Sequence, residues 1–358
     1  MSSVRLPVAL DAMGGDRAPD VVVAGALLAC AQGLGPIDLI GDPERVEASL
    51  GRKGRDQPIR VVPAAEVIGM AEHPGRAARA KRQSSMHVGM GLVHRGEACA
   101  LVSAGNSGAL MAVGLLELRR VAGCDRPAIA TAMPSARDPV VLLDLGANIE
   151  CRASHLVQFA LMGAAFAEVA LGRTRPSVGL LSNGTEATKG TEALREAHRL
   201  LTAMDLRYVG YVEGRALPLG EVDVVVTDGF VGNVALKLSE GIAQALFEQI
   251  RVELKGDWLG TLGAGLMRRA LGRLKARLDW VNVGAAPLLG LDGLALVAHG
   301  ASTPEAIANA VRRAREYAEL DLVGHIRTAL AVASAPTEHT TTAELPIVRI
   351  RPGEPSRE

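Results

Sequence analysis

Several features are scarce in this chain of 358 residues, and each shortage narrows what the chain can be. Aromatic residues make up only 3%, and the formal net charge is +0, so no overall basic field attracts nucleic acid. The four cysteines form no C-x-x-C pair, and no cysteine or histidine spacing matches a metal site. The composition therefore predicts reduced cysteines, no metal, no cofactor and no nucleic-acid partner.

Long hydrophobic runs are also missing, since no apolar stretch approaches the roughly 18–20 residues that cross a bilayer. The segment Met1–Leu10 is too short and too lightly charged for a signal peptide. With 48% hydrophobic and 22% charged residues, the composition is that of a globular protein with an ample core. We therefore expect a cytoplasmic protein without a spanning helix.

Short apolar runs alternate with helical patterns along most of the chain. Strand–turn–helix units are expected at 98–120, 139–171, 177–202 and 222–250. This alternation predicts an α/β fold, a three-layer α/β/α sandwich with a largely parallel sheet. It forms one catalytic domain over residues 1–334, and the polar tail 335–358 is expected to be disordered.

One segment interrupts this rhythm. Residues 234–278 read as a single helical tract, broken by Gly256 and by the Gly-rich stretch Gly260–Gly265. The simplest geometry is a projecting helical hairpin whose tip is Gly256–Met267. Apolar residues near this tip stand beside a basic flank, which suits a membrane surface or an oligomer interface. The apolar candidates are Trp258, Leu259, Leu262 and Leu266.

Five apolar runs end in small, polar, Gly-rich turns that lead into helical patterns. The turns are Asp11–Asp16, Ser103–Gly108, Asp144–Asn148, Ser182–Gly190 and Thr227–Asn233. In an open parallel sheet such turns gather at one edge, so all five are expected to line one crevice. Helix N-termini favour anions there. The candidate phosphate- or substrate-binding residues are Asp11, Gly14, Gly15, Asp16, Ser103, Gly105, Asn106, Ser107, Asn148, Asn183, Gly184 and Thr185.

Four further residues in or near these turns are candidates for catalysis: Lys189, Asp228, Asn233 and His299. Lys189 stands in an order, Lys-Gly-Thr, that is not a P-loop, but a lysine at a strand end can neutralise phosphate or an oxyanion. Each has a structural alternative: a solvated lysine for Lys189, a helix cap for Asp228 and a hydrogen-bonded fixture for His299. Asp16 likewise has the alternative of capping a helix or a turn.

The five turns in this order, with Glu72–Met86 between the first two, resemble the PlsX family of phosphate acyltransferases. The resemblance implies that an acyl group passes from acyl-[acyl carrier protein] to inorganic phosphate for bacterial phospholipid synthesis. It also implies a fold related to phosphotransacetylases and isocitrate- or isopropylmalate-type dehydrogenases. The resemblance further implies a homodimer, peripheral contact with the inner face of the cell membrane, and docking of the acidic carrier protein. The basic candidates for docking are Arg76, Arg79, Lys81 and Arg82.

In this scheme the turns at Ser103–Ser107 and Asn183–Lys189 hold phosphate, and Lys189 neutralises charge. Gly14 and Gly15 let the backbone approach, while Asp228, Asn233 and His299 orient ligands or move protons. Two other classes of function remain open on the sequence. One is an NAD(P)-dependent dehydrogenase of the isocitrate type, which does not need the absent G-x-G-x-x-G motif; the other is a non-catalytic scaffold for the carrier protein.

Overall fold

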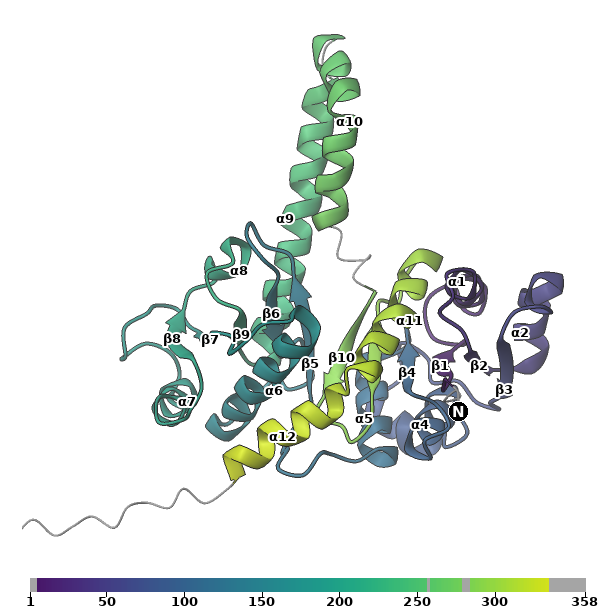
Figure 1. The fold of residues 1–358 in the computed structure, drawn as a ribbon, viewed down its shortest axis with the longest axis horizontal. Helices are drawn as coiled ribbons and strands as arrows, with labels where there is room; N and C mark the ends of the chain where they lie inside the picture. Colours follow the sequence, from purple (N-terminus) through teal and green to yellow (C-terminus); the bar gives the residue numbers. More distant parts are fainter. Residues whose placement is uncertain (1–4, 256–257, 279–283, 335–358) are drawn as a thin grey trace, which may run out of the picture.

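The sheet contains eleven strands in the computed structural model, which describes residues 5–255, 258–278 and 284–334 (Figure 1). Their spatial order is β3-β2-β1-β4-β11-β10-β5-β6-β9-β7-β8. The strands are β1 (Val8–Asp11), β2 (Ile37–Gly41), β3 (Ile59–Pro63), β4 (Ala100–Ser103), β5 (Ala128–Met133), β6 (Val140–Leu143), β7 (Val178–Leu181), β8 (Tyr208–Val212), β9 (Val224–Val226), β10 (Ala285–Leu289) and β11 (Ala295–Ala298).

Helices cover both faces of this sheet, as the alternating pattern predicted. The helical segments are α1 (Asp20–Ala31), α2 (Pro43–Leu50), the short 3₁₀ turn η1 (Gly51–Gly54), α3 (Pro74–Ala80), α4 (Ser85–His94), α5 (Ser107–Glu117), α6 (Ala153–Leu171), α7 (Glu192–Thr202), α8 (Ala216–Leu219), α9 (Gly229–Lys255), α10 (Trp258–Leu278), α11 (Pro304–Glu319) and α12 (Leu322–Ser334). α11 begins directly after Thr303, because the Thr303 hydroxyl caps it by accepting the Ala306 N–H.

Two hydrophobic clusters, one on each face, make the structure a three-layer sandwich. Buried residues of α1, α2, α6, α7, α11 and α12 share the first cluster, and those of α3, α4, α5 and α8 share the second. Successive strand residues alternate between the two, so Val8 and Leu10 face one layer and Ala9 the other. The predicted fold class is therefore confirmed.

The sheet is mostly parallel, but its direction reverses at the centre. β10 is antiparallel to both β11 and β5, and β5 is antiparallel to β6. Hence β6, β9, β7 and β8 run opposite to β1, β4 and β11. The two strand groups therefore point in opposite directions, and the five turns do not follow strands of one parallel sheet. Four of the five turns still contribute to one cavity, as expected, through Asp16, Gly105 and Ser107, Leu145 and Asn233, whereas the turn Ser182–Gly190 does not.

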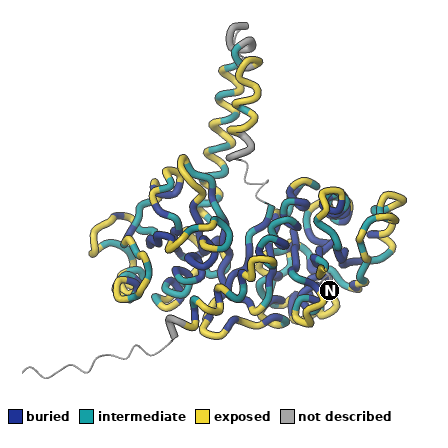
Figure 2. The backbone as a smooth tube through the Cα atoms, viewed as in Figure 1, coloured by how far each residue is buried: buried dark blue, intermediate teal, exposed yellow. Residues whose placement is uncertain are grey.

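Helices α9 and α10 pack against each other and project from the body, with much of their surface exposed (Figures 1 and 2). The hairpin expected from the sequence is present, but its predicted tip was too long. α9 continues to Lys255 and α10 already begins at Trp258, so the stretch Gly260–Gly265 is helical. α9 also starts at Gly229, five residues before the expected tract.

One helix of the described residues, α6, is long and apolar enough by length and composition to cross a membrane, contrary to expectation. It has 19 residues, and 61% of its apolar window is buried inside the protein. α6 packs on strands β6 and β9 and is covered by α7 and α12. Its apolar composition is accounted for by this position in the core.

Candidate functional site

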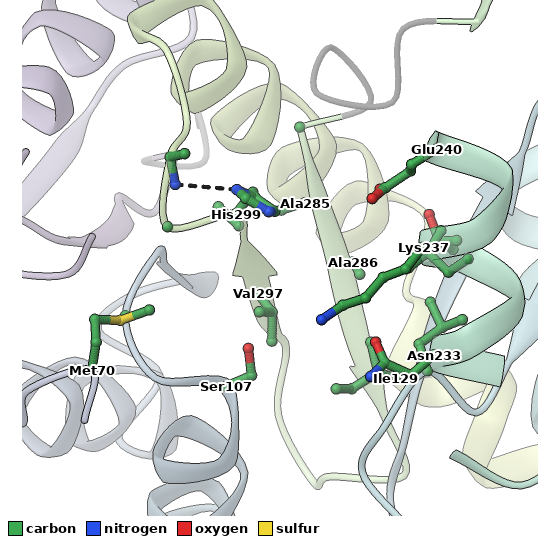
Figure 3. Close-up of a pocket in the computed structure, with 18 of the residues that line it drawn as sticks. Met70, Ser107, Ile129, Asn233, Lys237, Glu240, Ala285, Ala286, Val297 and His299 are labelled. Atoms are coloured by element: carbon green, nitrogen blue, oxygen red, sulfur yellow. Dashed lines mark hydrogen bonds between the residues drawn. The ribbon is translucent and has the colours of Figure 1, made fainter. Parts of the chain in front are cut away.

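A cavity of about 470 Å³ lies over the centre of the sheet, on the face that also carries α5 and α9 (Figure 3). Its floor consists of Ile129 from β5, Ala286 from β10 and Val297 from β11. One side, which we call the α5 wall, is formed by Asp16, Gly105 and Ser107. The opposite side, the α9 wall, is formed by Asn233, Leu236, Lys237 and Glu240. His299 closes one end of the cavity.

The α5 wall is held by a buried carboxylate behind it. Asp11 at the end of β1 accepts a hydrogen bond from Ser103 Oγ at 2.6 Å, and Ser103 Oγ accepts the Gly105 N–H at 3.1 Å. Burial raises the pKa of the Asp11 carboxyl, although these hydrogen bonds oppose the shift. A Cβ at Gly14 would lie 2.7 Å from both Asp11 Oδ2 and the Gly105 nitrogen. Glycine is needed here because the first two turns touch.

Asn106 shapes the same wall from the outside. Its Oδ1 accepts the Ala109 N–H and so caps α5, while its Nδ2 donates to the carbonyls of Met70 and Glu72. The cap leaves Ser107, the first residue of α5, exposed at the cavity with its hydroxyl facing inward (Figure 3). A helix N-terminus with a free hydroxyl is a favourable place for an anion.

The α9 wall is anchored by a second buried carboxylate, Asp144, at the end of β6. Its two oxygens accept four hydrogen bonds, from the backbone N–H groups of Ile129, Ala147 and Asn148 and from Asn148 Nδ2. Burial raises the pKa of this carboxyl. A Cβ at Gly232 would overlap the Asp144 carbonyl oxygen. The start of α9 is therefore packed directly on the turn after β6.

From this anchor α9 presents a column of polar groups to the cavity. Asn233, Lys237 and Glu240 are spaced i, i+4 and i+7, so they lie on one helical face. Lys237 points from α9 into the cavity, toward the side where Ser107 lies (Figure 3). No hydrogen bond or ion pair holds its ammonium among the residues that the structure describes. It is an unpaired cation facing a helix N-terminus.

His299 is the residue directly after β11. Its Nδ1 accepts the backbone N–H of Ala301 at 3.1 Å, so in the neutral ring the proton is on Nε2. The turn that carries it meets the first turn of the chain, because the Asp16 N–H donates to the Gly300 carbonyl. The His299 ring therefore has one nitrogen that accepts a backbone hydrogen bond and one that can donate a hydrogen bond to a ligand.

The predicted site residues separate into three groups. Those that line the cavity are Asp16, Gly105, Ser107, Asn233 and His299. Those that support its walls from behind are Asp11, Gly14, Gly15, Ser103, Asn106, Asn148 and Asp228. Those that do not line it are Asn183, Gly184, Thr185 and Lys189. Asp228 is a helix cap, the structural alternative given for it, because its carboxylate accepts the Val231 N–H of α9. Asp16 does not cap α1, whose N-cap residue is Pro19.

The turn Ser182–Gly190 lies beyond β9, at the end of β7, outside this cavity. Asn183 Oδ1 accepts the Gly190 N–H, and the Lys189 N–H donates to the Glu186 carbonyl, so the turn is closed on itself. The cation that reaches the cavity is Lys237 instead. Sequence reasoning missed both Lys237 and Glu240, although their helical spacing from Asn233 could have identified them.

The four basic residues proposed for docking also differ in their contacts. Lys81 is not free, because its Nζ contacts Glu72 Oε1 at 2.6 Å and the Val67 carbonyl at 2.7 Å. Arg82 is exposed and lies 3.5 Å from Glu117. Arg76 and Arg79 are exposed on α3, and neither has an ion-pair or hydrogen-bond partner among the described residues. Within those residues no cluster of three or more His, Cys, Asp or Glu side chains could hold a metal ion.

Comparisons with known proteins agree with this architecture. A family model described as "Fatty acid synthesis protein" matches residues 6–324. A "Phosphate acyltransferase" of Citrifermentans bemidjiense is 49% identical over 314 residues, covering 87% of this chain and 89% of its own. Another, of Pelotomaculum thermopropionicum, is 48% identical over 325 residues, covering 91% and 95%.

Solved structures with much lower identity show the same fold. A phosphotransacetylase from Streptococcus pyogenes superimposes with a TM-score of 0.58 at 18% identity, covering 92% of this chain and 95% of its own. A 4-hydroxythreonine-4-phosphate dehydrogenase from Klebsiella pneumoniae gives a TM-score of 0.54 at 13% identity, covering 87% and 99%. The identity with the phosphate acyltransferases is far above this level, and the family model spans all the residues that line the cavity. The chain belongs to the PlsX family of phosphate acyltransferases, enzymes of fatty acid and phospholipid synthesis.

Proposed function

We propose that the cavity transfers a fatty acyl group from acyl-[acyl carrier protein] to inorganic phosphate, giving acyl phosphate and free carrier protein. The observation that carries this proposal is the unpaired ammonium of Lys237 facing Ser107 at the start of α5. Phosphate bound between them is neutralised by the lysine and by the helix N-terminus. Phosphate is itself a nucleophile, so the reaction needs no activated serine or cysteine.

The other polar groups of the cavity suit the remaining steps. A phosphate oxygen forms a bond to the thioester carbon, and the carbon–sulfur bond breaks. Lys237 and the side-chain amide of Asn233 stabilise the oxyanion that develops between these events. The proton of hydrogen phosphate passes to the departing thiolate to give the thiol, while His299 orients the phosphate by donating a hydrogen bond from Nε2. Protons and charge balance without any further reactant.

Incubation of the purified protein with acyl-carrier protein and phosphate tests this reaction directly. Hydroxylamine should trap a phosphate-dependent acyl product as the hydroxamate. A protein that forms no such product, beside a relative that does, would refute the proposal. Protection from thermal unfolding by phosphate, but not by NAD(P), should accompany it, because the cavity binds the anion without a dinucleotide.

The carrier protein docks, in this proposal, on the exposed arginines of α3. Arg76 and Arg79 have no partner among the described residues and stand beside the loop that Asn106 ties to the α5 wall. An acidic partner bound there is delivered next to the cavity, and complementary charge increases the association rate. Lys81 contributes less, because Glu72 already neutralises it.

The hairpin supports two further proposals. Val234, Leu238, Ile242 and Leu246 of α9 are each at least half exposed at a spacing of four residues, and we propose that a second copy covers them in a homodimer. Leu238→Glu with Ile242→Glu should then halve the mass measured in solution. An unchanged mass would exclude this surface from the interface.

Toward the start of α10, Leu266 is 82% exposed and is followed by the exposed basic residues Arg268 and Arg269. We propose that this end of the hairpin rests on anionic lipid at the inner face of the cell membrane, in a cytoplasmic enzyme. The side chains of Trp258, Leu259 and Leu262 lie outside the described residues. Flotation with anionic vesicles should be lost in Leu259→Glu/Leu262→Glu, and equal flotation of both proteins would reject the anchor.

A further inference from the structure

The floor of the cavity is an uncovered part of the sheet centre. β10 is the sixth of eleven strands, and α11 packs on one face of β10 and β11. On the other face, Ala286 and Val297 form a cross-strand pair and are only partly buried. Their neighbours along the strands, Ala285, Leu296 and Ala298, are all buried. Apolar side chains left open at the centre of a sheet are typical of a ligand surface.

The side chains around this pair separate apolar from charged surface. Ile129 completes the apolar floor and Leu236 stands beside it, whereas Asp16 stands on the α5 wall. Lys237 and Glu240 stand on the α9 wall (Figure 3). None of the floor residues is charged. This arrangement matches a ligand with a hydrocarbon part next to an ionic head group.

We propose that the acyl chain runs over the Ala286–Val297 pair during transfer, and that the side-chain size at these positions limits the length of chain that the floor accommodates. This rests on the proposed function. A thioester carbonyl next to the phosphate bound between Lys237 and Ser107 is surrounded by charged or polar groups. The hydrocarbon that follows it is stabilised only where it removes apolar surface from water, which is the floor.

The small size of Ala286 gives the floor its depth. A leucine at this position adds three carbons to the floor and occupies space that the chain would otherwise fill. Shortening Val297 to alanine removes two carbons from the opposite member of the same cross-strand pair. Each methylene that loses or gains burial changes binding by about fourfold, so the two substitutions should act in opposite directions.

The experiment compares octanoyl-, dodecanoyl- and hexadecanoyl-carrier protein as substrates. We expect Ala286→Leu to lower the ratio of kcat/KM for hexadecanoyl over octanoyl substrate by at least about tenfold, with an unchanged KM for phosphate. Val297→Ala should raise the same ratio by about threefold or more. Ala203→Leu, at the exposed end of α7, is the matched control and should leave the ratio unchanged.

The possible outcomes distinguish a failure of this inference from a failure of the proposed acyl transfer. An equal loss for all three chain lengths in a folded Ala286→Leu protein overturns the inference and leaves acyl transfer intact. If Ala286→Leu does not fold, Val297→Ala decides, and an unchanged ratio in that variant also overturns it. A wild-type protein that transfers no acyl group to phosphate contradicts the proposed function instead.

Discussion

The two walls of the cavity are built in opposite ways. The α5 wall is a set of turns whose polar groups are satisfied internally, with Asp11 bonded to Ser103 and Asn106 bonded to the Met70–Glu72 loop. The α9 wall is the face of one long helix, and its polar side chains Lys237 and Glu240 have no protein partner among the described residues. The supporting side chains of the α5 wall are thus bonded within the protein, whereas the charged side chains of the α9 wall are free to bind a ligand.

This difference separates positioning from chemistry. The α5 wall supplies a fixed surface made of backbone N–H groups and one hydroxyl, which costs no reorganisation when an anion arrives. The α9 wall supplies the charge, and its position depends on the packing of Gly232 against Asp144. Changes to the α9 charge should therefore affect turnover most, while changes behind the α5 wall should appear mainly in stability.

Removing the free cation should have the largest effect. Lys237→Ala is expected to lower kcat/KM by about 100-fold or more, because one preorganised charge at a developing oxyanion contributes on that scale. Steady-state kinetics with acyl-carrier protein and phosphate measure it. Lys189→Ala is the matched comparison, and a larger loss in that variant would return the neutralising role to the turn Ser182–Gly190.

Displacing the α9 wall without changing its charged residues should have the second-largest effect. Gly232→Ala places a methyl group against the Asp144 carbonyl oxygen, and overpacking of this kind costs about 1–3 kcal/mol. We expect a lower melting temperature together with reduced kcat. Gly241→Ala, which meets no atom within 4 Å, is the control on the same helix. Equal stability of the two variants would contradict the packing described for the start of α9.

Reversing the exposed charges of α3 should have a smaller effect, confined to the carrier protein. Arg76→Glu/Arg79→Glu is expected to raise KM for acyl-carrier protein about tenfold and to weaken its salt dependence, with KM for phosphate unchanged. Arg207→Glu, an exposed arginine on the far half of the sheet, provides the comparison. A rise in KM of the same size in both variants would indicate general charge repulsion and exclude a docking site.

The smallest effect is expected behind the α5 wall, in the pH dependence of stability. Burial raises the pKa of Asp11 in the folded protein above its ordinary value, so the folded state holds this proton more tightly than the unfolded state. The free energy of unfolding should therefore fall as pH rises from the ordinary aspartate pKa through the raised one. Asp11→Asn should flatten this decline. Parallel unfolding curves for both proteins between pH 4 and 8 would show that Asp11 carries no such penalty.

Much of the architecture follows from local sequence. The capped start of α11 at Thr303 and the strand–turn–helix unit around Asn106 were predictable because one side chain satisfies the first N–H groups of each helix. The reversal at the centre of the sheet was not. β10 is five residues long, contains Pro287, and has no local signal for its direction, which depends on pairing with β5 and β11.

The site residues likewise include some that the sequence predicted and some that it did not. Residues in turns, such as Ser107 and His299, were identified because a turn at a strand end exposes its side chains. Lys237 was missed because a lysine on an amphipathic helix resembles any solvated lysine until the partner wall is known. Lys81 is the opposite case, a lysine that was predicted to be free but is not. The run of basic residues predicted free charges, whereas Glu72, nine residues earlier, neutralises Lys81.

Because α9 is one continuous helix, a movement of its exposed end also moves the residues that it places at the cavity. Its 27 residues form a rod about 40 Å long, with Lys237 about 12 Å from the end that is packed on Asp144. A tilt of about 5° about that end would carry the far end by about 3.5 Å and Lys237 by about 1 Å, a displacement that can cost roughly 100-fold in rate. Whatever holds the hairpin in place therefore also holds the ammonium at its working distance.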